Sequence, residues 1–391
     1  MSSSARIAIM LPRFSRYGGV EQFGYRLADV LAGKGHQVDF ICARQEIDAP
    51  GGITVRRTGR PFGPRWLKML LFCVRAEALC QAGEYDCAIS LGKTLNQDIM
   101  RVGGGPLAQF WRYSEEAFPP GFPRTFKRLR RHIRPDNLLT LWIERRQFAR
   151  TPVIAAVSHF VRDLILASYP NLAPEDIRVI YNRPDLARFS PPNAEQREEA
   201  RRMFGIGSEE TAIGLATSNL LLKGTGPLIQ ALAKLPETCS LYIAGGRNHG
   251  AYDALARRLG IGGRVRFLGK VEDMPRWYHA LDVFTLPSFY DACSNAVLEA
   301  LASGLPVLSS CSNGSSHFLP PENIVAHPGD SEELARVLTR LIKQAGENRK
   351  KGSRPVFTWP DDVTAGLDAF VDLVEDFLRN HRHAAEKNPR A

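Results

Sequence analysis

The residues best suited to chemistry lie in one stretch of the chain, from Pro287 to Ala302. A strand predicted to end at Leu286 leads into a loop, and a helix is predicted from about Ser294. Backbone N–H groups at Ser294 and Asn295 would then form an anion site, to which the helix dipole adds. Glu299 is the lone carboxylate in this apolar helix. Because burying an unpaired charge is costly, a diol that offers two O–H donors would be a suitable partner.

A second carboxylate, Asp291, lies eight residues before Glu299, in the loop that precedes this helix. It could face a different hydroxyl of the same ligand. A structural interpretation is also open, in which Asp291 or Ser294 caps the helix and Glu299 lies on a solvated stripe. The residues alone do not decide between ligand binding and structure.

Two other strand-to-helix turns carry residues that suit a phosphate or a sugar. Lys223 follows a predicted strand, and a lysine in such a loop can offset diphosphate charge as a point cation. Gly18 and Gly19 lie at the first turn, where glycine lets the backbone approach a ligand closely. A solvated lysine and an ordinary tight turn are the alternatives. The glycine pair is not a G-x-G-x-x-G motif, which disfavours a standard dinucleotide site.

The elements that position these turns alternate between strand and helix. In the first half the pattern predicts strands at 6–10, 38–42, 86–91, 153–157 and 179–181, and helices at 20–31, 64–82 and 158–169, with a less regular stretch over 92–134. In the second half it predicts strands at 212–217, 240–244, 264–268, 282–286, 306–310 and 324–326, and helices at 224–234, 250–260, 274–280, 294–303 and 331–345. This alternation predicts an α/β fold with two Rossmann-like, doubly wound parallel-sheet domains that face each other across a cleft.

Breaks in the strand–helix pattern predict the domain boundaries. Residues 182–193 carry three prolines and no clear period, which indicates an interdomain linker. The predicted domains are therefore 1–183 and 190–355. A helix over 361–380, with a clear apolar stripe, follows the second domain and is expected to pack back toward the first.

The composition is that of an ordinary globular protein, with 391 residues, 44% of them hydrophobic, and a formal charge of +10. Nothing in the sequence reaches the roughly 18 apolar residues of a membrane span. The first residues predict a strand instead of a signal peptide. The seven cysteines are scattered without a C-x-x-C pair, which disfavours a disulfide framework and a zinc knuckle. We therefore expect a protein of the reducing cytoplasm.

A basic region covers residues 124–150. Its cations are Arg124, Lys127, Arg128, Arg130, Arg131, Arg134, Arg145, Arg146 and Arg150, against the acids Asp136 and Glu144. Phe126, Trp142 and Phe148 lie between them. Such clusters suit an anionic membrane surface or a phosphorylated glycolipid. A solvated helix face is the alternative, and no motif supports nucleic-acid binding.

Two polar residues could serve an acceptor. Asp98 and Arg101 follow the strand predicted to end near Leu91, so they are expected at the carboxyl edge of the first sheet. Asp98 could orient an acceptor hydroxyl there. The alternative is a surface salt bridge between Asp98 and Arg101.

These motifs, in this order, resemble glycosyltransferase family 4, whose members are retaining, nucleotide-sugar-dependent enzymes with the two-domain GT-B fold. The resemblance covers nearly the whole chain and is carried by Gly18–Gln22, Val179–Phe189, Lys223–Gly224, Phe267–Gly269, Ala280–Ser288 and Asp291–Pro306. The family signature is two acidic residues eight apart, usually both glutamate, and here they are Asp291 and Glu299. The family usually has an arginine five residues before Lys223. Here that position is Ser218, a departure shared by the lipopolysaccharide-core glucosyltransferase subgroup.

The resemblance implies a role for each of these residues. Glu299 would hold the ribose of the donor and Asp291 the transferred sugar. Lys223 and the amides of Ser294 and Asn295 would hold the diphosphate. The remaining donor-site positions that it implies are Gly18, Gly19, Ser218, Gly269 and Val271, with the loop at 269–271 meeting the base. Domain 1–183 would bind the acceptor and domain 190–355 the nucleotide sugar.

The implied reaction is the metal-independent transfer of a sugar, with retention at the anomeric carbon, from a nucleotide-diphosphate sugar to a glycolipid. The resemblance places it in lipopolysaccharide core biosynthesis, at the inner face of the cytoplasmic membrane, with no cofactor besides the substrate. The sequence agrees on one point, because it contains no Asp-x-Asp motif. The alternatives are another polysaccharide or a soluble acceptor, an epimerase reaction, and a non-catalytic nucleotide-sugar-binding protein. The donor base, the sugar and the acceptor stay open.

Overall fold

The computed structural model describes residues 4–59, 61–350, 354–360 and 366–387. Within these ranges the chain forms two compact units. The first unit contains residues 4–109, 125–182 and the C-terminal helix, and the second contains residues 110–124 and 183–360. The chain therefore changes unit after Asn182, where the predicted linker begins. The segment 110–124, which we expected in the first domain, groups with the second unit.

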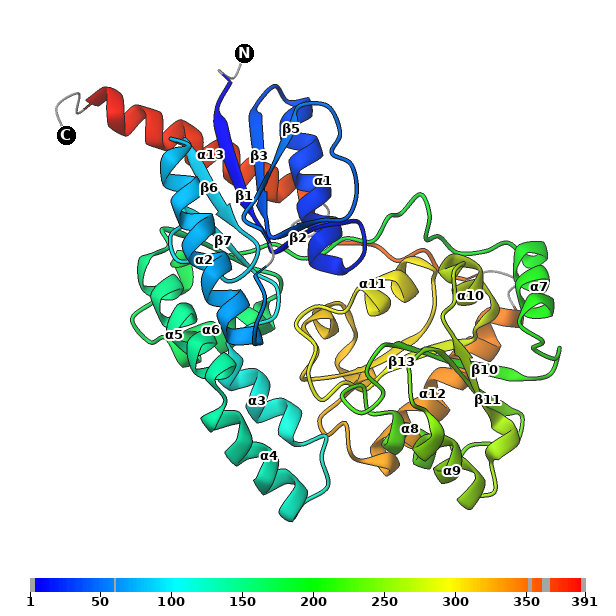
Figure 1. Cartoon of the computed structure of the whole chain (residues 1–391). Coiled ribbons are helices and arrows are strands. Elements are labelled where there is room, and N and C mark those ends of the chain that lie inside the picture. The colour runs from blue at the N-terminus through cyan, green and yellow to red at the C-terminus, as the bar shows by residue number, and fades with distance from the viewer. Residues whose placement is uncertain (1–3, 60, 351–353, 361–365, 388–391) are drawn as a thin grey trace. The chain divides into compact units, whose positions relative to one another are not determined.

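The first unit is built on a parallel sheet of seven strands in the order β5-β3-β1-β6-β7-β8-β9 (Figure 1). Its strands are β1 (Arg6–Met10), β3 (Gln37–Cys42), β5 (Ile53–Arg57), β6 (Cys87–Ser90), β7 (Ile99–Val102), β8 (Val153–Ala156) and β9 (Ile177–Val179). A separate short pair joins β2 (Arg13–Phe14) to β4 (Arg44–Gln45). The strand order reverses between β1 and β6, which is the arrangement of a doubly wound fold.

Helices pack on both faces of this sheet. They are α1 (Gly19–Gly33), α2 (Arg65–Ala82), α5 (Pro135–Arg150), α6 (His159–Ser168) and α13 (Leu367–Lys387), while the changes of unit at 109/110 and 124/125 fall inside α3 (Leu107–Glu115) and α4 (Phe122–Ile133). Successive side chains of a strand point to opposite faces. Ile7 and Ile9 accordingly pack in the cluster that holds α1 and α13, whereas Ala8 and Met10 pack with α2.

The C-terminal helix α13 packs on the first unit, as predicted. Phe370 is fully buried and meets Phe23 of α1 edge to face, with the ring centroids 5.3 Å apart. The predicted range of 361–380 differs at both ends. Residues 361–365 lie outside the described residues, and the helix extends to Lys387. The apolar stripe of α13 therefore completes a core that the first unit begins about 360 residues earlier at β1.

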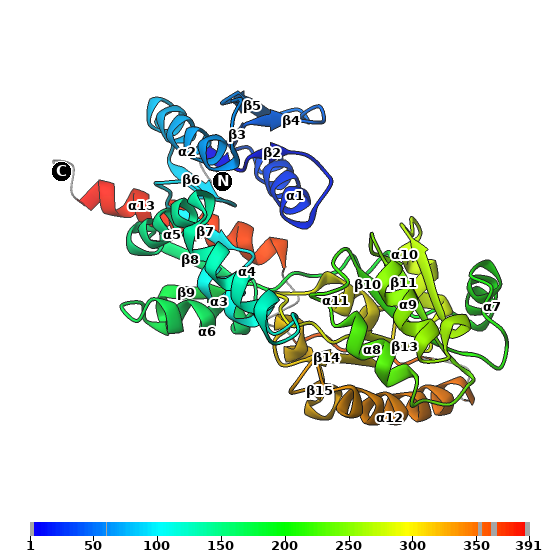
Figure 2. The same ribbon diagram turned by 60° about the horizontal axis from the view of Figure 1, so that its bottom comes forward.

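The second unit is a parallel sheet of six strands in the order β12-β11-β10-β13-β14-β15. Its strands are β10 (Thr211–Thr217), β11 (Cys239–Gly245), β12 (Val265–Gly269), β13 (Val283–Leu286), β14 (Val307–Ser310) and β15 (Ile324–Val325). Its helices are α7 (Ala194–Met203), α8 (Thr225–Leu232), α9 (Gly250–Arg258), α10 (Met274–Ala280), α11 (Asn295–Ala302) and α12 (Ser331–Lys350). Figures 1 and 2 show α8, α9 and α12 on one side of the sheet and α10 and α11 on the other. The order reverses between β10 and β13.

The secondary structure of the second unit matches the sequence pattern closely, whereas parts of the first unit do not. The predicted irregular stretch 92–134 contains β7, α3 and α4, and α5 starts directly after it. Pro119 and Pro120 fall between α3 and α4, and Pro123 is the second residue of α4, where proline is tolerated, so these prolines mark a helix boundary and not an irregular stretch. Strand β5 and helix α7 were also missed, and both carry mostly charged or polar side chains that give no clear apolar period.

The docking of α13 predicts a measurable loss when its central aromatic side chain is removed. Phe370→Ala should lower the free energy of unfolding by about 3–5 kcal/mol, the usual cost of deleting a fully buried phenylalanine ring. Urea-induced unfolding followed by circular dichroism would measure the change. The control is Arg379→Ala on the exposed side of the same helix, which should cost less than about 0.5 kcal/mol. Equal effects of the two substitutions would mean that α13 is not part of the core.

Candidate active site

The candidate site lies where the strand order of the second sheet reverses. β10 and β13 are adjacent parallel strands, so the loops that leave their carboxyl ends start at the same edge of the sheet. The loop after β10 contains Lys223, and the loop after β13 contains Asp291. In doubly wound folds ligands bind at this reversal point. The topology therefore brings together two residues that the sequence placed in separate motifs.

Backbone contacts hold these two loops against each other. The N–H of Phe289 donates to the carbonyl oxygen of Leu222 at 2.9 Å. Gly224 has φ +67°, and a Cβ atom there would lie 2.3 Å from the carbonyl oxygen of Pro287. Both features require glycine, because other residues rarely adopt this φ and would collide with the neighbouring backbone. The glycine after Lys223 thus sets how closely the two loops approach.

Lys223 and Asp291 form an ion pair across the two loops. The Lys223 ammonium also donates to the carbonyl oxygen of Tyr290 at 3.2 Å. The two side chains are only 16% and 18% exposed, so the pair is partly shielded from water. Asp291 is fixed from its backbone as well, since its N–H donates to Ser312 and its carbonyl oxygen accepts from Gly314. A cation and a carboxylate therefore lie side by side at the reversal point, on loops that backbone hydrogen bonds hold together.

Ser294 caps helix α11, which answers one alternative left open by the sequence. Its Oγ accepts the N–H of Val297 at 3.4 Å, and its carbonyl oxygen accepts from the hydroxyl of Ser315 at 3.0 Å. Asn295 is the first helical residue and its side chain is exposed. The side chain of Ser294 accepts from the N–H of Val297, so the earlier backbone amides of this turn could still bind an anion.

Glu299 is half-buried, so it does not lie on a fully solvated stripe. It is flanked on α11 by the fully buried Leu298 and Ala300, and the Tyr278 hydroxyl lies 3.0 Å from its Oε2 atom. Burial raises the pKa of Glu299 to about 7, although the Tyr278 hydroxyl and the charge of Arg188 act in the opposite direction. Since burial disfavours the charged form of this carboxyl, hydrogen bonds donated by a ligand would stabilise it as the carboxylate.

The remaining donor-site positions fall on two different units. Ser218 is exposed after β10, Gly269 ends β12 with φ +65°, and Val271 is half-buried just beyond it. These three residues follow the carboxyl ends of strands in the second sheet. Gly18 and Gly19 belong to the first unit, where Gly18, with φ +108°, immediately precedes α1. Their implied contacts with a donor remain predictions.

The expected placement of Asp98 is wrong, because the sequence did not reveal β7. Asp98 immediately precedes this strand, at the amino-terminal edge of the sheet, where its Oδ2 accepts the N–H of Ala88 at 2.7 Å. Arg101 lies inside β7 and is 9% exposed. Its guanidinium donates to Asn182 at 2.6 Å and lies 3.9 Å from the centre of the Phe23 ring. The two residues therefore have separate structural partners.

Aromatic residues from a distant part of the sequence hold the loop that carries Asp291. Within the second unit, the ring of Tyr290 meets Phe110 edge to face at 5.3 Å and lies 5.9 Å from Tyr113. Tyr290 immediately precedes Asp291 and accepts from Lys223 through its carbonyl oxygen. The sequence gave no signal for this contact, since only the folded chain brings α3 to this loop.

The basic region 124–150 falls on α4 and α5. Phe126, Leu129 and Ile133 share one face of α4 by their spacing and are 53–65% exposed. Leu138 and Trp142 of α5 are 52% and 50% exposed. Exposed apolar side chains thus lie among the cations of this region. In the described part of the chain, no helix has both the length and the apolar character needed to cross a membrane.

Two family models match the chain. Residues 17–188 match the model described as Glycosyltransferase Family 4, and residues 213–344 match the model described as Glycosyl transferases group 1. Together the two matches account for most of the chain, including the turns with Gly18 and Lys223 and the helix with Glu299. The chain belongs to glycosyltransferase family 4, as the sequence motifs indicated.

Curated relatives match over shorter segments. The lipopolysaccharide glucosyltransferase WaaG of Escherichia coli (strain K12) is 28% identical over 200 residues, 46% of this chain and 54% of the relative. The lipopolysaccharide core biosynthesis glycosyltransferase LpsE of Rhizobium meliloti (strain 1021) is 35% identical over 122 residues, which are 31% of this chain and 36% of the relative. A D-inositol 3-phosphate glycosyltransferase of Xylanimonas cellulosilytica is 30% identical over 244 residues, 58% of each chain. The chain thus spans about half of the length of these relatives, or less.

Solved structures confirm the fold class. A crystal structure of WaaG superposes with a TM-score of 0.75 at 21% identity, covering 94% of this chain and 99% of that one. HepE of Anabaena, in complex with UDP and glucose, superposes with a TM-score of 0.61 at 17% identity, covering 99% of this chain and 100% of that one. Two doubly wound parallel-sheet domains are therefore the architecture of this chain, as predicted.

The burial of Glu299 predicts that the free energy of unfolding falls as the pH rises through the range in which this carboxyl ionises. Below its ordinary pKa of 4.5 the carboxyl is protonated in both the folded and the unfolded chain. As the pH rises to about 7, the unfolded chain ionises first, so the folded state loses stability relative to a variant that cannot ionise. Glu299→Gln should therefore match the wild type at pH 4 and exceed its free energy of unfolding by roughly 2–3 kcal/mol at pH 8.

Urea-induced unfolding at pH 4, 6 and 8 would measure this difference. Glu209→Gln, at an exposed glutamate, is the matched control and should change the free energy by less than about 0.5 kcal/mol. Equal stability of the wild type and Glu299→Gln at pH 8 would contradict the burial of this carboxyl.

Proposed function

We propose that this protein is a glycosyltransferase that moves a sugar from a nucleotide-diphosphate sugar to an acceptor. The observation that carries the proposal is the meeting of Lys223 and Asp291 at the reversal point, one loop away from the buried carboxyl of Glu299. A cation suits a diphosphate, and two carboxyl groups that can accept hydrogen bonds suit the hydroxyls of a sugar and of a ribose. Family membership supports the same assignment.

In the proposed donor complex each group has one partner. The Lys223 ammonium and the first-turn amides of α11 hold the diphosphate. Because the ammonium pairs with Asp291, an incoming diphosphate competes for it and releases the carboxylate to accept from a hydroxyl of the transferred sugar. Glu299 accepts from the ribose hydroxyls. The base lies against the loop at 269–271.

The proposed chemistry retains the configuration of the anomeric carbon and uses no metal. The bond from this carbon to the diphosphate oxygen breaks, the acceptor oxygen bonds to the same face, and the acceptor proton passes to the departing diphosphate. Backbone amides and Lys223 stabilise the negative charge that develops on the leaving group. Each preorganised donor of this kind is typically worth about 3–4 kcal/mol. The missing Asp-x-Asp motif supports this route, since no such carboxylate pair is available for a metal–diphosphate bridge.

The acceptor we propose is a glycolipid of the lipopolysaccharide core, reached at the inner face of the cytoplasmic membrane. Two relatives carry lipopolysaccharide names. The exposed apolar side chains among the cations of α4 and α5 support contact with an anionic lipid surface. A small soluble acceptor is the second candidate, supported by the match to D-inositol 3-phosphate glycosyltransferases.

Loss of the diphosphate cation should affect the reaction and not the fold. Lys223→Gln should lower kcat/KM for nucleotide-sugar turnover about 100- to 1,000-fold, the usual effect of removing one charge-stabilising donor. Glu299→Ala should abolish turnover while the circular dichroism spectrum is unchanged. Release of nucleoside diphosphate from a panel of nucleotide sugars is the readout. Lys234→Gln, just beyond the C-terminal end of α8, is the matched control and should keep wild-type activity.

Each outcome of this assay separates the alternatives. Near wild-type turnover in Glu299→Ala would defeat the site assignment. Binding of a nucleotide sugar by the wild type without release of diphosphate would instead identify a non-catalytic binding protein.

The basic region predicts binding to anionic vesicles. Arg128→Glu combined with Arg130→Glu should weaken sedimentation with phosphatidylglycerol vesicles at least about tenfold, because each cation near such a surface contributes about 1 kcal/mol. Arg257→Glu combined with Arg258→Glu, on the exposed side of α9, is the charge-matched control and should bind as the wild type does. Equal loss of binding in both double variants would mean that binding depends only on net charge. No loss in either double variant would refute the membrane contact.

A further inference from the structure

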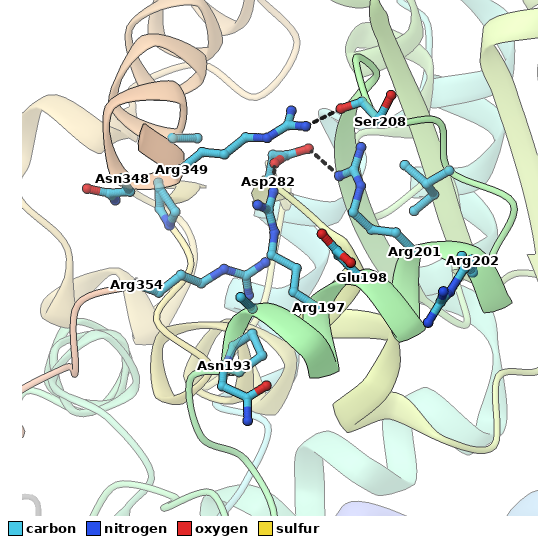
Figure 3. Close-up of a pocket in the computed structure, with 15 residues that line it drawn as sticks. Asn193, Arg197, Glu198, Arg201, Arg202, Ser208, Asp282, Asn348, Arg349 and Arg354 are labelled. Atoms are coloured by element: carbon cyan, nitrogen blue, oxygen red, sulfur yellow. Dashed lines mark hydrogen bonds and ion pairs between the residues drawn. The ribbon is translucent and has the colours of Figure 1, made fainter. Parts of the chain in front are cut away.

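A cavity with charged side chains in its wall lies in the second unit, at the edge of the sheet opposite to the candidate active site. It has a volume of about 420 Å³ (Figure 3). Its walls include Ser208 before β10, Asp282 before β13 and Pro306 before β14. These residues mark the amino ends of parallel strands, whereas Lys223 and Asp291 follow the carboxyl ends. The cavity is therefore separate from the proposed donor site.

The lining of this cavity is strongly cationic. Five arginines contribute to it, against the two carboxylates Glu198 and Asp282. The arginines are Arg197, Arg201, Arg202, Arg349 and Arg354. They come from α7, from the last turn of α12 and from the segment after it, so the fold gathers them from three places along the chain. Positive charge is in excess in a partly enclosed space.

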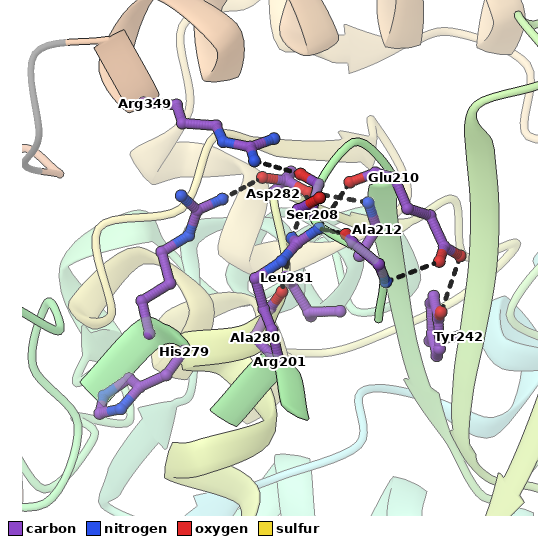
Figure 4. A network of polar contacts seen from close by, with 12 residues as sticks. Arg201, Ser208, Glu210, Ala212, Tyr242, His279, Ala280, Leu281, Asp282 and Arg349 are labelled. Carbon is purple, nitrogen blue, oxygen red and sulfur yellow. Dashed lines mark hydrogen bonds and ion pairs between the residues drawn. The ribbon is translucent and has the colours of Figure 1, made fainter. Parts of the chain in front are cut away.

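Two of these arginines serve the fold. Arg201 is 6% exposed and donates to the carbonyl oxygens of Gly207 and Glu210 and to Asp282 (Figure 4). Arg354 donates to four main-chain carbonyl oxygens, at Tyr278, His279, Leu281 and Ser303. The terminal nitrogens of both guanidiniums donate to the protein itself. They form the frame of the cavity and are not available to a ligand.

The other three arginines line the cavity and have side-chain donors that no described residue accepts from. Arg197 pairs with Asp282 through one terminal nitrogen, but its buried Nε has no hydrogen-bond partner among the described residues. Arg349 donates to the carbonyl oxygen of Ser208. The Arg202 side chain is exposed and makes no hydrogen bond or ion pair within the described ranges. A guanidinium carries five N–H donors, so each of the three can serve a further acceptor.

The enclosed charges also act on one another. Burial lowers the pKa of Arg197, and the charges of Arg201 and Arg349 lower it further, against the attraction of Asp282. An anion in the cavity would offset this repulsion and accept from the donors that the protein leaves unused. Guanidinium groups bind phosphate oxygens in a two-pronged geometry, which makes phosphate the best match to three of them.

We propose that this cavity is a second anion site that binds a phosphate-bearing small molecule through Arg197, Arg202 and Arg349. Its volume exceeds that of inorganic phosphate and falls within the range of pockets for small organic ligands, so the ligand class is a phosphate ester or a diphosphate. The site does not depend on the proposed transferase activity, since it shares no residue with the donor site.

Isothermal titration with pyrophosphate tests this proposal in a Lys223→Gln background, which removes the donor-site cation. Pyrophosphate should still bind this variant, and adding Arg197→Gln with Arg349→Gln should weaken binding at least tenfold. The charge-matched control adds Arg257→Gln with Arg258→Gln and should bind unchanged. If Arg197→Gln disturbs the circular dichroism spectrum, Arg202→Gln with Arg349→Gln carries the test, because these side chains lie nearer the surface.

The outcomes decide the proposal. Loss of all pyrophosphate binding in Lys223→Gln alone, or equal binding with and without the cavity arginines, would overturn it. Titration with glucose 6-phosphate and with phosphatidylglycerol vesicles distinguishes the source of the phosphate. Arginine-dependent binding of the soluble ester supports a metabolite site, and arginine-dependent binding of vesicles alone would assign the same chemistry to a lipid headgroup.

Discussion

The ion pair between Lys223 and Asp291 is the interaction on which the candidate site depends. It exists only because the chain order reverses between β10 and β13, which lets two loops leave neighbouring strands at one edge. Gly224 then permits the close approach of these loops, since any side chain there would meet the Pro287 carbonyl oxygen. A pair that is mutually neutral but only partly exposed can exchange partners when an anion arrives. This property connects the fold to the proposed chemistry.

Glu299 differs from Asp291 in how its partly buried carboxyl is held. Among the described residues its carboxyl forms no ion pair and contacts the Tyr278 hydroxyl, so the fold bears a cost when the group ionises. Such a cost is common at functional sites, where stability is given up for a group with the right protonation behaviour. The arginine cavity differs again, because there positive charge is concentrated at the opposite edge of the same sheet. One parallel sheet thus offers two edges with distinct electrostatics.

The sequence predicted the second unit well and the contacts of the site only in part. Its strands are apolar runs between clear breaks, so their positions followed from the pattern, and the lone carboxylate Glu299 stood out in an apolar helix. The contact of Tyr290 with Phe110 could not be predicted, because it joins residues far apart in the chain. Strand β7 was missed because Arg101 interrupts its apolar run, and only the structure shows that the Phe23 ring and Asn182 accommodate this charge. Local pattern reveals elements, whereas pairing between them is a property of the folded chain.

The central claim is that a diphosphate takes Lys223 from Asp291 at the start of α11. A crystal structure of the protein with UDP bound tests it most directly. The account predicts a phosphate oxygen about 3 Å from the Lys223 ammonium and from a first-turn amide of α11, with the ribose hydroxyls on Glu299 and the Lys223–Asp291 contact broken. UDP bound elsewhere, with that ion pair intact, would contradict it.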